Sequence, residues 1–335
     1  MAPSATESPP YKEIEDPFPK LVAPQAAPRN YQILYLNVLV YSYMHIVSLY
    51  GIYLYCTIAT WKSFIFRKYN LRSMGMTAGA HRLWSHRAYK AKKPLQILLM
   101  LLNSVAFGNT IIHFARDHRL HHRYSDTDAD PHNATRGFFY SHIGWLMVKK
   151  HPEVLRRGKL INISDLYANP VLRFQEKYIL LLAGIFCFGL PTLIPMYFFG
   201  ESLNTAFHLA VFRYTVFVHV VFLVNSAAHL WGNKPYDKQI KPVQNYTVSL
   251  LTFGEGFHNY HHTFPWDYRT AELGNNWLNF TTKFIDFFAW IGWAYDLKAV
   301  PEDFAHSRAN KAGDGSDLWG SKLPAQLIHP DRSFA

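Results

Sequence analysis

The chain has 335 residues, of which 49% are hydrophobic and 16% aromatic, and its formal net charge is +11 at pH 7. It has two cysteines, Cys56 and Cys187, both in apolar segments, which argues against a disulfide framework or a thiolate metal site. The charge suits nucleic acid or anionic lipid equally, but no nucleic-acid motif is present. Because the apolar residues come in long blocks, we interpret the chain as a membrane protein.

The amino-terminal third predicts a disordered arm followed by membrane segments of unequal quality. Residues 1–30 contain seven prolines and mixed charge, which predicts a disordered cytosolic arm without the apolar core of a signal peptide. The block Ile33–Ala59 is long enough to cross a bilayer. The next segment, Trp61–Ala80, is a poor span because it contains Arg67, Lys68 and Arg72, and each mid-membrane charge costs about 2.5–3.5 kcal/mol.

Three further apolar blocks follow along the chain. The block Pro94–Ala115 is broken by two asparagines, whereas Tyr178–Phe199 and Ala206–Leu230 are clean spans joined by a polar turn at 200–205. An apolar aromatic stretch, Phe280–Trp293, precedes a polar tail at 305–335, so we expect the membrane domain to cover residues 31–304. Lysine and arginine crowd residues 81–177 and are absent from the turn at 200–205, which places 81–177 and everything after Trp231 on the cytoplasmic side.

Three histidine clusters carry the strongest chemical signal in the sequence. They are His81-Arg-Leu-Trp-Ser-His86, His118-Arg-Leu-His121-His122 and His258-Asn-Tyr-His261-His262. In the second and third clusters the spacing i, i+3, i+4 puts all three imidazoles on one face of a helix. The i, i+5 pair of the first cluster suits one helix less well, so we expect it to straddle a helix end. Random placement of the 18 histidines would give only about 0.05 HxxHH matches per chain.

The three clusters can share one site only if they lie on one side of the membrane. Two clean spans separate His122 from His258, and an even number returns the chain to the same side. The block Pro94–Ala115 separates His86 from His118, so a full crossing there would place the first cluster opposite the second. We therefore predict that this block does not cross fully.

Eight clustered imidazoles exceed the ligands of one tetrahedral site, which predicts two metal ions. Imidazole ligands suit zinc, copper, iron or nickel. Histidine-rich iron without haem is an arrangement that activates oxygen. A structural zinc site is the alternative, although such sites usually recruit cysteine, and neither cysteine lies near the clusters.

Around the clusters the sequence resembles the animal acyl-CoA desaturases (the stearoyl-CoA desaturase-like family), most closely the insect type, which includes housekeeping and moth pheromone-biosynthesis enzymes. The resemblance covers most of residues 30–310. The matching stretches are Thr77-Ala-Gly-Ala-His-Arg-Leu-Trp-Ser-His86, Ala115-Arg-Asp-His-Arg-Leu-His-His122, Asp130-Pro-His-Asn133, Gly137-Phe-Phe-Tyr-Ser-His-Ile-Gly-Trp145, Asn225-Ser-Ala-Ala-His229 and Gly254-Glu-Gly-Phe-His-Asn-Tyr-His-His-Thr-Phe-Pro265.

This resemblance implies an all-α integral membrane fold with four transmembrane helices and a cytosolic helical cap that holds a histidine-ligated di-iron site. It implies a ninth ligand, His229, and an approach of Asn225 to the second iron through water. The implied ligands of the two Fe²⁺ ions are His81, His86, His118, His121, His122, His229, His258, His261 and His262.

The resemblance also implies a reaction and its partners. A fatty acyl-CoA would be desaturated with O₂ at the endoplasmic reticulum membrane, with both termini cytosolic. The chain has no His-Pro-Gly-Gly stretch for haem, so electrons are expected from a separate cytochrome b5 and its NADH reductase. Positions that match acyl-CoA contacts of the family are Asn37, Asn109, Arg116, Asp117, Lys149 and Lys150.

The chain departs from relatives near the expected acyl path. Phe114 and Phe222 stand where tryptophan is common, and Gly108 replaces a larger polar residue, so chain-length preference and bond position do not follow from the motifs. Two other functions stay open from the residues alone. They are a membrane hydroxylase on the same metal site, whose product would be an alcohol, and a non-catalytic metal-binding membrane protein or receptor.

Overall fold

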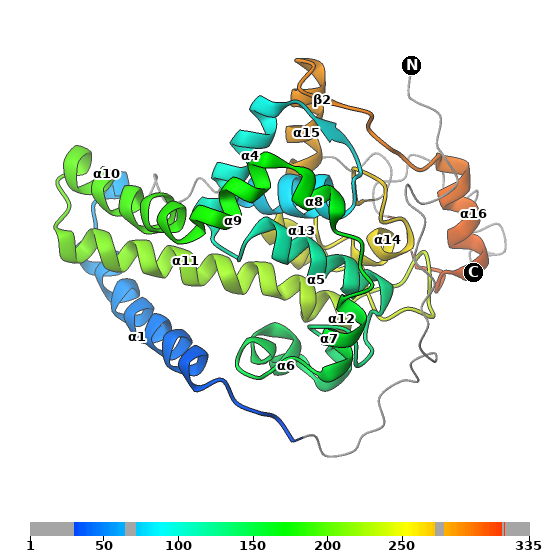
Figure 1. Cartoon of the computed structure of the whole chain (residues 1–335), viewed down its shortest axis with the longest axis horizontal. Coiled ribbons are helices and arrows are strands. Elements are labelled where there is room, and N and C mark those ends of the chain that lie inside the picture. Colours follow the sequence, from blue (N-terminus) through cyan, green and yellow to red (C-terminus); the bar gives the residue numbers. More distant parts are fainter. Residues whose placement is uncertain (1–29, 64–71, 272–277, 317, 319–335) are drawn as a thin grey trace, which may run out of the picture.

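The computed structural model describes residues 30–63, 72–271, 278–316 and 318, so Arg67, Lys68 and most of the predicted arm and tail lie outside it. The regular structure of the described residues is mostly helical, as predicted (Figure 1). The two strands, β1 (Lys90–Ala91) and β2 (Ala294–Tyr295), form an antiparallel pair.

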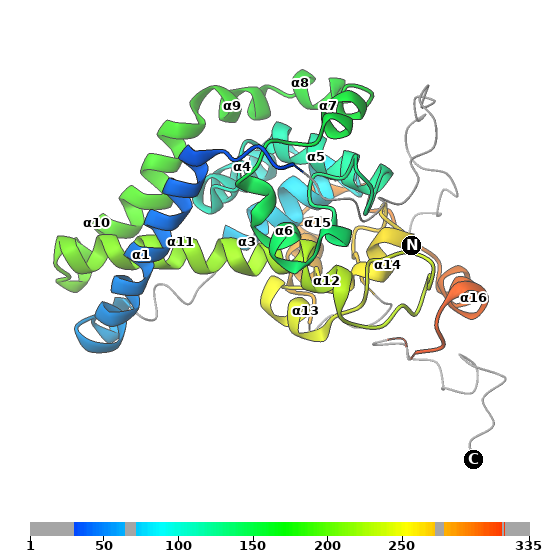
Figure 2. The same cartoon turned by 90° about the horizontal axis from the view of Figure 1, so that it is seen from below.

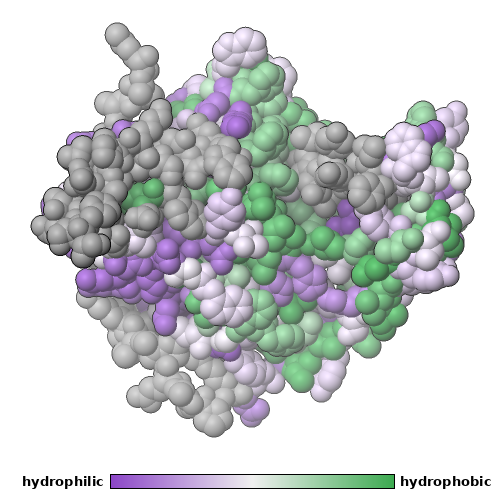
Figure 3. All heavy atoms as spheres, turned by 180° about the vertical axis from the view of Figure 1, so that it is seen from behind, coloured by the Kyte–Doolittle hydropathy of each residue, from purple (hydrophilic) through white to green (hydrophobic). Residues whose placement is uncertain are grey.

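Three helical segments among the described residues are long and apolar enough to cross a membrane. They are α1 (Tyr35–Thr57); the run α9 (Pro170–Leu182), η4 (Ala183–Gly189) and α10 (Leu190–Phe199); and α11 (Leu203–Asn225) with its continuation α12 (Ala227–Leu230). These segments match the predicted spans and gather on one side of the molecule (Figures 1 and 2). Hydrophobic side chains dominate that side of the surface, and hydrophilic ones gather on the opposite side (Figure 3).

Helices α1 and α11 run antiparallel, and their polar contacts give the direction of the chain. Ser48 Oγ donates to Thr215 Oγ1 at 2.7 Å midway along the pair. At the turn between α10 and α11, Glu201 Oε1 accepts from the amide and the hydroxyl of Thr60 at 2.7 and 2.9 Å. Thr60 therefore lies at the end of the bundle where α10 turns into α11. His81 lies at the opposite end, where the histidines gather.

The block Pro94–Ala115 is a bent pair of helices, which agrees with the prediction that it does not cross fully. Helices α4 (Lys93–Ala106) and α5 (Ile111–Arg123) meet at an angle of 85°. Left-handed backbone at Phe107 (φ 46°) and Asn109 (φ 149°) makes the bend, and the Thr110 hydroxyl caps α5 by accepting from the His113 amide. The histidines on either side of the block lie in contact, so the chain leaves and returns on one side.

The first histidine cluster lies at the end of a π-helix, η1 (Gly75–Ser85), which follows α3 (Arg72–Met74). A π-helix bonds residue i to residue i+5, and the His86 amide donates to the His81 carbonyl at 3.1 Å. His86 is the residue that ends the helix, as predicted, and the wider π-turn brings it to the same side as His81. Gly75 lets η1 pack directly against the backbone of α4 at Leu102 and Asn103.

The remaining elements form a cap at the histidine end. They are η2 (Ala134–Arg136), α6 (Phe138–His142), η3 (Gly144–Leu146), α7 (Pro152–Gly158), α8 (Ser164–Ala168), α13 (Tyr246–Thr252), α14 (His258–Thr263), α15 (Phe280–Trp290) and α16 (Glu302–Ala312). Helix α16 contains the start of the segment predicted as a polar tail. Its residues Ala305 and Ala309 are buried with Tyr260 and Phe264 in a small apolar cluster.

We expect Gly75→Ala to destabilise the fold. A Cβ there would lie 2.1 Å from the amide nitrogen of Asn103, and backbone cannot move aside as a side chain can. The expected loss is about 1–3 kcal/mol, the usual cost of overpacking. The measurement is the melting temperature of the detergent-purified protein. Gly184→Ala is the control because nothing lies within 4 Å of its added Cβ, and equal melting temperatures would contradict the prediction.

Candidate metal centre and substrate cavity

Nine buried or half-buried imidazoles meet at the junction of the cap and the spans. Four segments supply them: the end of η1, helix α5, helix α12 and helix α14. Their ligand-capable nitrogens form two groups, each with all members within 4.8 Å of one another. One group is His81, His86, His118, His122 and His261, and the other is His121, His229, His258 and His262.

Each HxxHH motif is divided between the two groups, which the sequence did not indicate. In α5 the i, i+4 pair His118 and His122 joins the group of five, and the i+3 residue His121 joins the group of four. In α14 the assignment is reversed, because His258 and His262 join the group of four and His261 the group of five. Around a helix axis, residue i+4 is rotated by only about 40° from residue i, whereas residue i+3 is rotated by about 60° in the opposite direction. The i+3 ring therefore points to a different neighbour than the i and i+4 rings.

The nitrogen separations within each group fit shared metal ligation. In the group of five, Nε2 atoms are 2.8 Å apart for His86 and His118, and 2.9 Å apart for His81 and His261. In the group of four, Nε2 of His258 lies 3.0 Å from that of His229. A tetrahedral site with metal–nitrogen bonds of about 2.0 Å has edges of about 3.3 Å.

Three buried carboxylates orient these rings, and sequence reasoning missed them. Glu255 lies 2.6 Å from His81 Nδ1, Asp130 lies 2.9 Å from His121 Nδ1, and Asp126 lies 3.0 Å from His229 Nδ1. Each carboxylate accepts the Nδ1 proton and leaves Nε2 free for a metal, as outer partners of metal-bound histidines commonly do. Asp130 and Glu255 occur in the matched motifs, which was the available signal.

Burial keeps most of the nine rings in the neutral form that a metal requires. Loss of hydration, with repulsion from neighbouring rings, lowers the pKa well below its ordinary value in His86, His118, His122, His258, His261 and His262. Burial alone would raise the pKa of Glu255, but Arg82 and His81 outweigh it and lower that pKa to about 2. The site thus combines neutral imidazoles with ionised carboxylates behind them, a donor set that fits two divalent metal ions.

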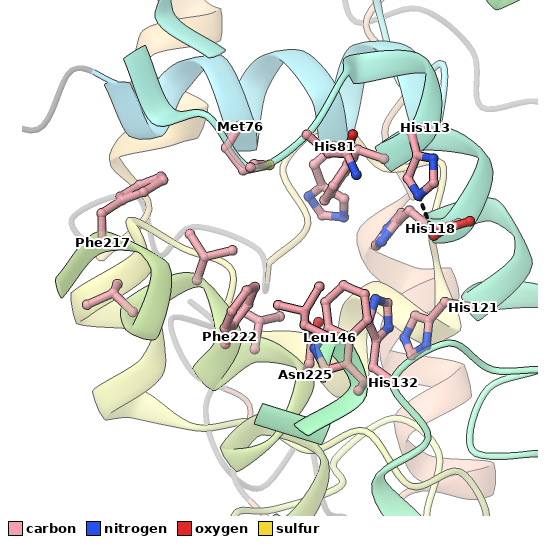
Figure 4. Close-up of a pocket in the computed structure, with 18 of the residues that line it drawn as sticks. Met76, His81, His113, His118, His121, His132, Leu146, Phe217, Phe222 and Asn225 are labelled. Carbon is pink, nitrogen blue, oxygen red and sulfur yellow. Dashed lines mark ion pairs between the residues drawn. The ribbon is translucent and has the colours of Figure 1, made fainter. Parts of the chain in front are cut away.

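A cavity runs from the histidine groups into the spans (Figure 4). His81, His118 and His121 line one end, and Met76, Phe217 and Phe222 line the other. Apolar atoms dominate the lining between the ends. His132 also lines this cavity and forms a smaller cluster with His121 and Asp130, which shares His121 and so belongs to the same centre. The cavity suits a long apolar chain held beside the histidines.

Four of the six positions predicted to contact the substrate line this cavity: Asn37, Asn109, Asp117 and Lys150. The other two do not. Arg116 donates to Asp117 Oδ1 at 2.8 Å, and Lys149 is exposed outside the cavity. Burial would raise the pKa of Asp117, but His113, Lys150 and Arg116 together hold it below its usual range. The cavity wall at Asp117 therefore carries a carboxylate that His113, Lys150 and Arg116 hold in its ionised form.

Asn225 and the three departures from the family pattern also line the cavity. Asn225 ends α11 and lies beside the histidines (Figure 4). Phe114 stacks on His118 with ring centroids 5.5 Å apart, and Phe222 lies at the apolar end. Gly108 lies at the bend between α4 and α5, where an added Cβ would meet only Met76 Cε, at 2.7 Å.

Comparison with known proteins agrees with this geometry. The sequence profile of the fatty acid desaturase family matches residues 59–277, which include every member of the two histidine groups. The chain belongs to the fatty acid desaturase family. The groups of five and four histidines are therefore features of a desaturase, and they lie beside an apolar cavity in a geometry that could hold metal ions.

Three relatives show how this desaturase stands within the family. It is 60% identical to an acyl-CoA Δ11 desaturase of Trichoplusia ni over 96% of this chain and 93% of the relative. It is 58% identical to an (11Z)-hexadec-11-enoyl-CoA conjugase of Bombyx mori over 89% of this chain and 91% of the relative. It is 54% identical to an acyl-CoA Δ9 desaturase of Acheta domesticus over 88% of this chain and 83% of the relative. The resemblance to insect desaturases is confirmed, and relatives of similar identity act at different positions.

We expect Asp130→Asn to weaken metal binding in the group of four. Asparagine is nearly isosteric but cannot hold the Nδ1 proton of His121 as a carboxylate does, and the loss of such a partner typically costs 10–100-fold in metal affinity. Metal content after dialysis against graded chelator, measured by mass spectrometry, checks this. Asp286→Asn serves as the control, since Asp286 pairs with the Tyr268 hydroxyl away from the histidines. Equal retention in both variants would contradict the assignment.

Proposed function

We propose that this protein is an acyl-CoA desaturase that introduces a double bond into a fatty acyl chain at a di-iron centre. The observation that carries the proposal is the union of two groups of imidazoles with an apolar cavity that extends from them. The nine histidines would hold the two irons, five on one and four on the other. Asn225 would approach the iron of the group of four through water, because it lines the cavity beside His258.

Iron fits better than structural zinc for reasons of ligand type. All nine donors are imidazoles, neither cysteine belongs to either group, and more than four histidines surround one of the positions. The bound metal pair would supply the oxidising power of O₂, which an unactivated methylene requires and acid–base chemistry cannot provide. The relatives named as acyl-CoA desaturases support this chemistry over hydroxylation.

The residues of this chain would position the substrate. A methylene offers no polar group for recognition, so the shape of the wall at Met76, Phe217 and Phe222 would set which carbons lie beside the histidines. Asn37, Asn109, Asp117 and Lys150, the polar lining positions, would contact the thioester and the CoA group. Arg116 and Lys149 would act outside the cavity, as phosphate contacts at its rim.

The same proposal gives the protein its place in the cell. We infer four spans in the endoplasmic reticulum membrane, with both termini and the cap in the cytosol, because Thr60 and His81 lie at opposite ends of the bundle and basic residues crowd the cap. Residues 1–30 would be a disordered arm, 31–304 the membrane domain and 305–335 the tail. Cytochrome b5, reduced by its NADH reductase, would supply electrons and dock on the basic cytosolic face by complementary charge.

Expression in a desaturase-deficient yeast tests the proposal. The wild-type chain should produce cis-unsaturated fatty acids whose double bonds can be mapped by mass spectrometry, whereas His121→Ala should produce none because it removes a metal ligand. The control is His208→Ala, the same change on a histidine that bonds the Asn204 carbonyl on the outside of α11. Hydroxylated products from the wild type, or normal desaturation by His121→Ala at equal protein level, would overturn the proposal.

We expect Gly108 to influence chain-length preference. Gly108→Ala and Gly108→Gln would add side-chain volume to the cavity wall beside Met76, so the longest accepted chain should shorten in that order. One methylene in an apolar pocket is worth about 1–3 kcal/mol, so the ratio of shorter to longer products should rise roughly tenfold. The product profile of the same yeast measures this ratio. Gly158→Ala, whose Cβ would contact Leu120 outside the cavity, should leave the ratio unchanged.

A further inference from the structure

A second set of histidines lies outside the metal centre and the substrate cavity. His219 of α11 lies between two others: its Nε2 is 2.9 Å from His45 Nε2 of α1, and its Nδ1 is 2.9 Å from His142 Nε2 of α6. His142 Nδ1 in turn lies 2.9 Å from Ser226 Oγ. We call His45, His219 and His142 the histidine chain. It links two apolar helices, α1 and α11, to the cap.

The hydrogen bonds of the histidine chain have one direction. His45 Nδ1 lies 2.5 Å from the Tyr41 carbonyl oxygen, which can only accept, so the Nδ1 carries the proton. In the neutral chain His45 Nε2 then accepts from His219, and His219 Nδ1 accepts from His142. Burial, with repulsion from His219, lowers the pKa of His142 to about 4, which favours this neutral form. His142 Nδ1 is left to accept from the Ser226 hydroxyl, whose single proton is shared with the Phe222 carbonyl of α11.

Ser226 is the break between α11 and α12. Its backbone (φ −113°, ψ −75°) departs from helical values, and its side chain is fully buried. Helix α12 after it spans only Ala227–Leu230, too short for a helix to hold its own orientation, so its contacts must set that orientation. This helix carries His229, whose Nε2 lies 3.0 Å from His258 Nε2 and whose Nδ1 lies 3.0 Å from Asp126.

Helix α6 holds α12 at both ends. His142 reaches Ser226 before the first residue of α12, and Phe138 stacks on Trp231 after the last, with ring centroids 5.1 Å apart. The histidine chain connects the first of these contacts to α1 and α11. The metal-binding residue His229 is thus carried on a short helix whose two ends are both held by α6.

We propose that His142, anchored through His219 and His45, is a positioning residue for the four-histidine group, because it sets the α11–α12 break at Ser226 and thereby the place of His229. This inference rests on the proposed di-iron function. Without the contact, Ser226 Oγ would keep only the Phe222 carbonyl of its own helix, also at 2.9 Å, and α12 would lose the contact at its amino-terminal end. The expected consequence is weaker metal binding in one group and not in the other.

Two amide variants separate positioning from a general loss of packing. Asparagine at residue 142 places an amide where the imidazole has Nδ1 and can still reach Ser226, whereas glutamine places it where the imidazole has Nε2 and can reach only His219. Both remove the ring. The full-length chain would be purified from iron-replete insect cells in detergent, and iron per chain and melting temperature would be measured after dialysis against graded chelator.

His142→Gln should lose one of two irons at a chelator concentration about 10–100-fold lower than the wild type, the range of affinity lost when a group that orients a metal ligand is removed. His142→Asn should retain both, Ser226→Ala should match His142→Gln, and the double variant Ser226→Ala, His142→Gln should show no further loss. The control His208→Ala should match the wild type. The turnover number should fall with the iron content.

Equal iron retention by His142→Asn and His142→Gln, whether both keep two irons or both lose one, would overturn the inference. Additive losses in the double variant would also overturn it, because two residues that act through one bond cannot add. A wild type that never holds two irons would instead refute the di-iron proposal, so the two failures are distinguishable. The melting temperatures identify a variant that has simply unfolded. If His142→Gln unfolds, the iron retention of Ser226→Ala is compared with that of His142→Asn instead.

Discussion

Nine imidazoles from four segments must meet at one buried place, and most of the architecture follows from that requirement. Buried imidazoles need their remaining nitrogens satisfied, so Glu255, Asp130 and Asp126 lie behind three of the rings. The segments must also approach from one side of the membrane, which explains the 85° bend between α4 and α5. The π-turns of η1 bring His86 round to His81 for the same reason.

The metal centre and the cavity depend on each other through shared elements. Helix α5 carries three of the nine histidines and also Phe114 and Asp117, so one helix connects the histidine groups to the wall of the cavity. Helix α11 contributes Phe217, Phe222 and Asn225 to the wall before it breaks at Ser226. A change in the packing of either helix would therefore shift the acyl chain and the histidines together, which couples bond position to the geometry of the centre.

The membrane bundle is also a support for the centre. Helix α1 contributes no histidine to the two groups, yet its His45 begins a hydrogen-bonded series that ends at Ser226, next to the helix that carries His229. Paired polar groups inside apolar spans usually have a role, because their desolvation must be compensated. Here each histidine of the series forms a hydrogen bond with the next, so they compensate one another's desolvation. The Tyr41 carbonyl accepts from His45 and so determines which nitrogen donates in each bond.

The sequence by itself predicted the helical class, the three apolar spans, the incomplete crossing of the block Pro94–Ala115 and eight clustered histidines, because hydrophobic blocks, span parity and i, i+3, i+4 spacing can be read along the chain. His229 and Asn225 came only from family resemblance, since a lone helix-end histidine has no local signal. The tertiary structure alone decided which histidine joins which group, which carboxylates orient them, and that His45, His219 and His142 meet. Those pairings join segments far apart in the chain, and helical spacing gives the direction of a side chain but not the neighbour that it meets.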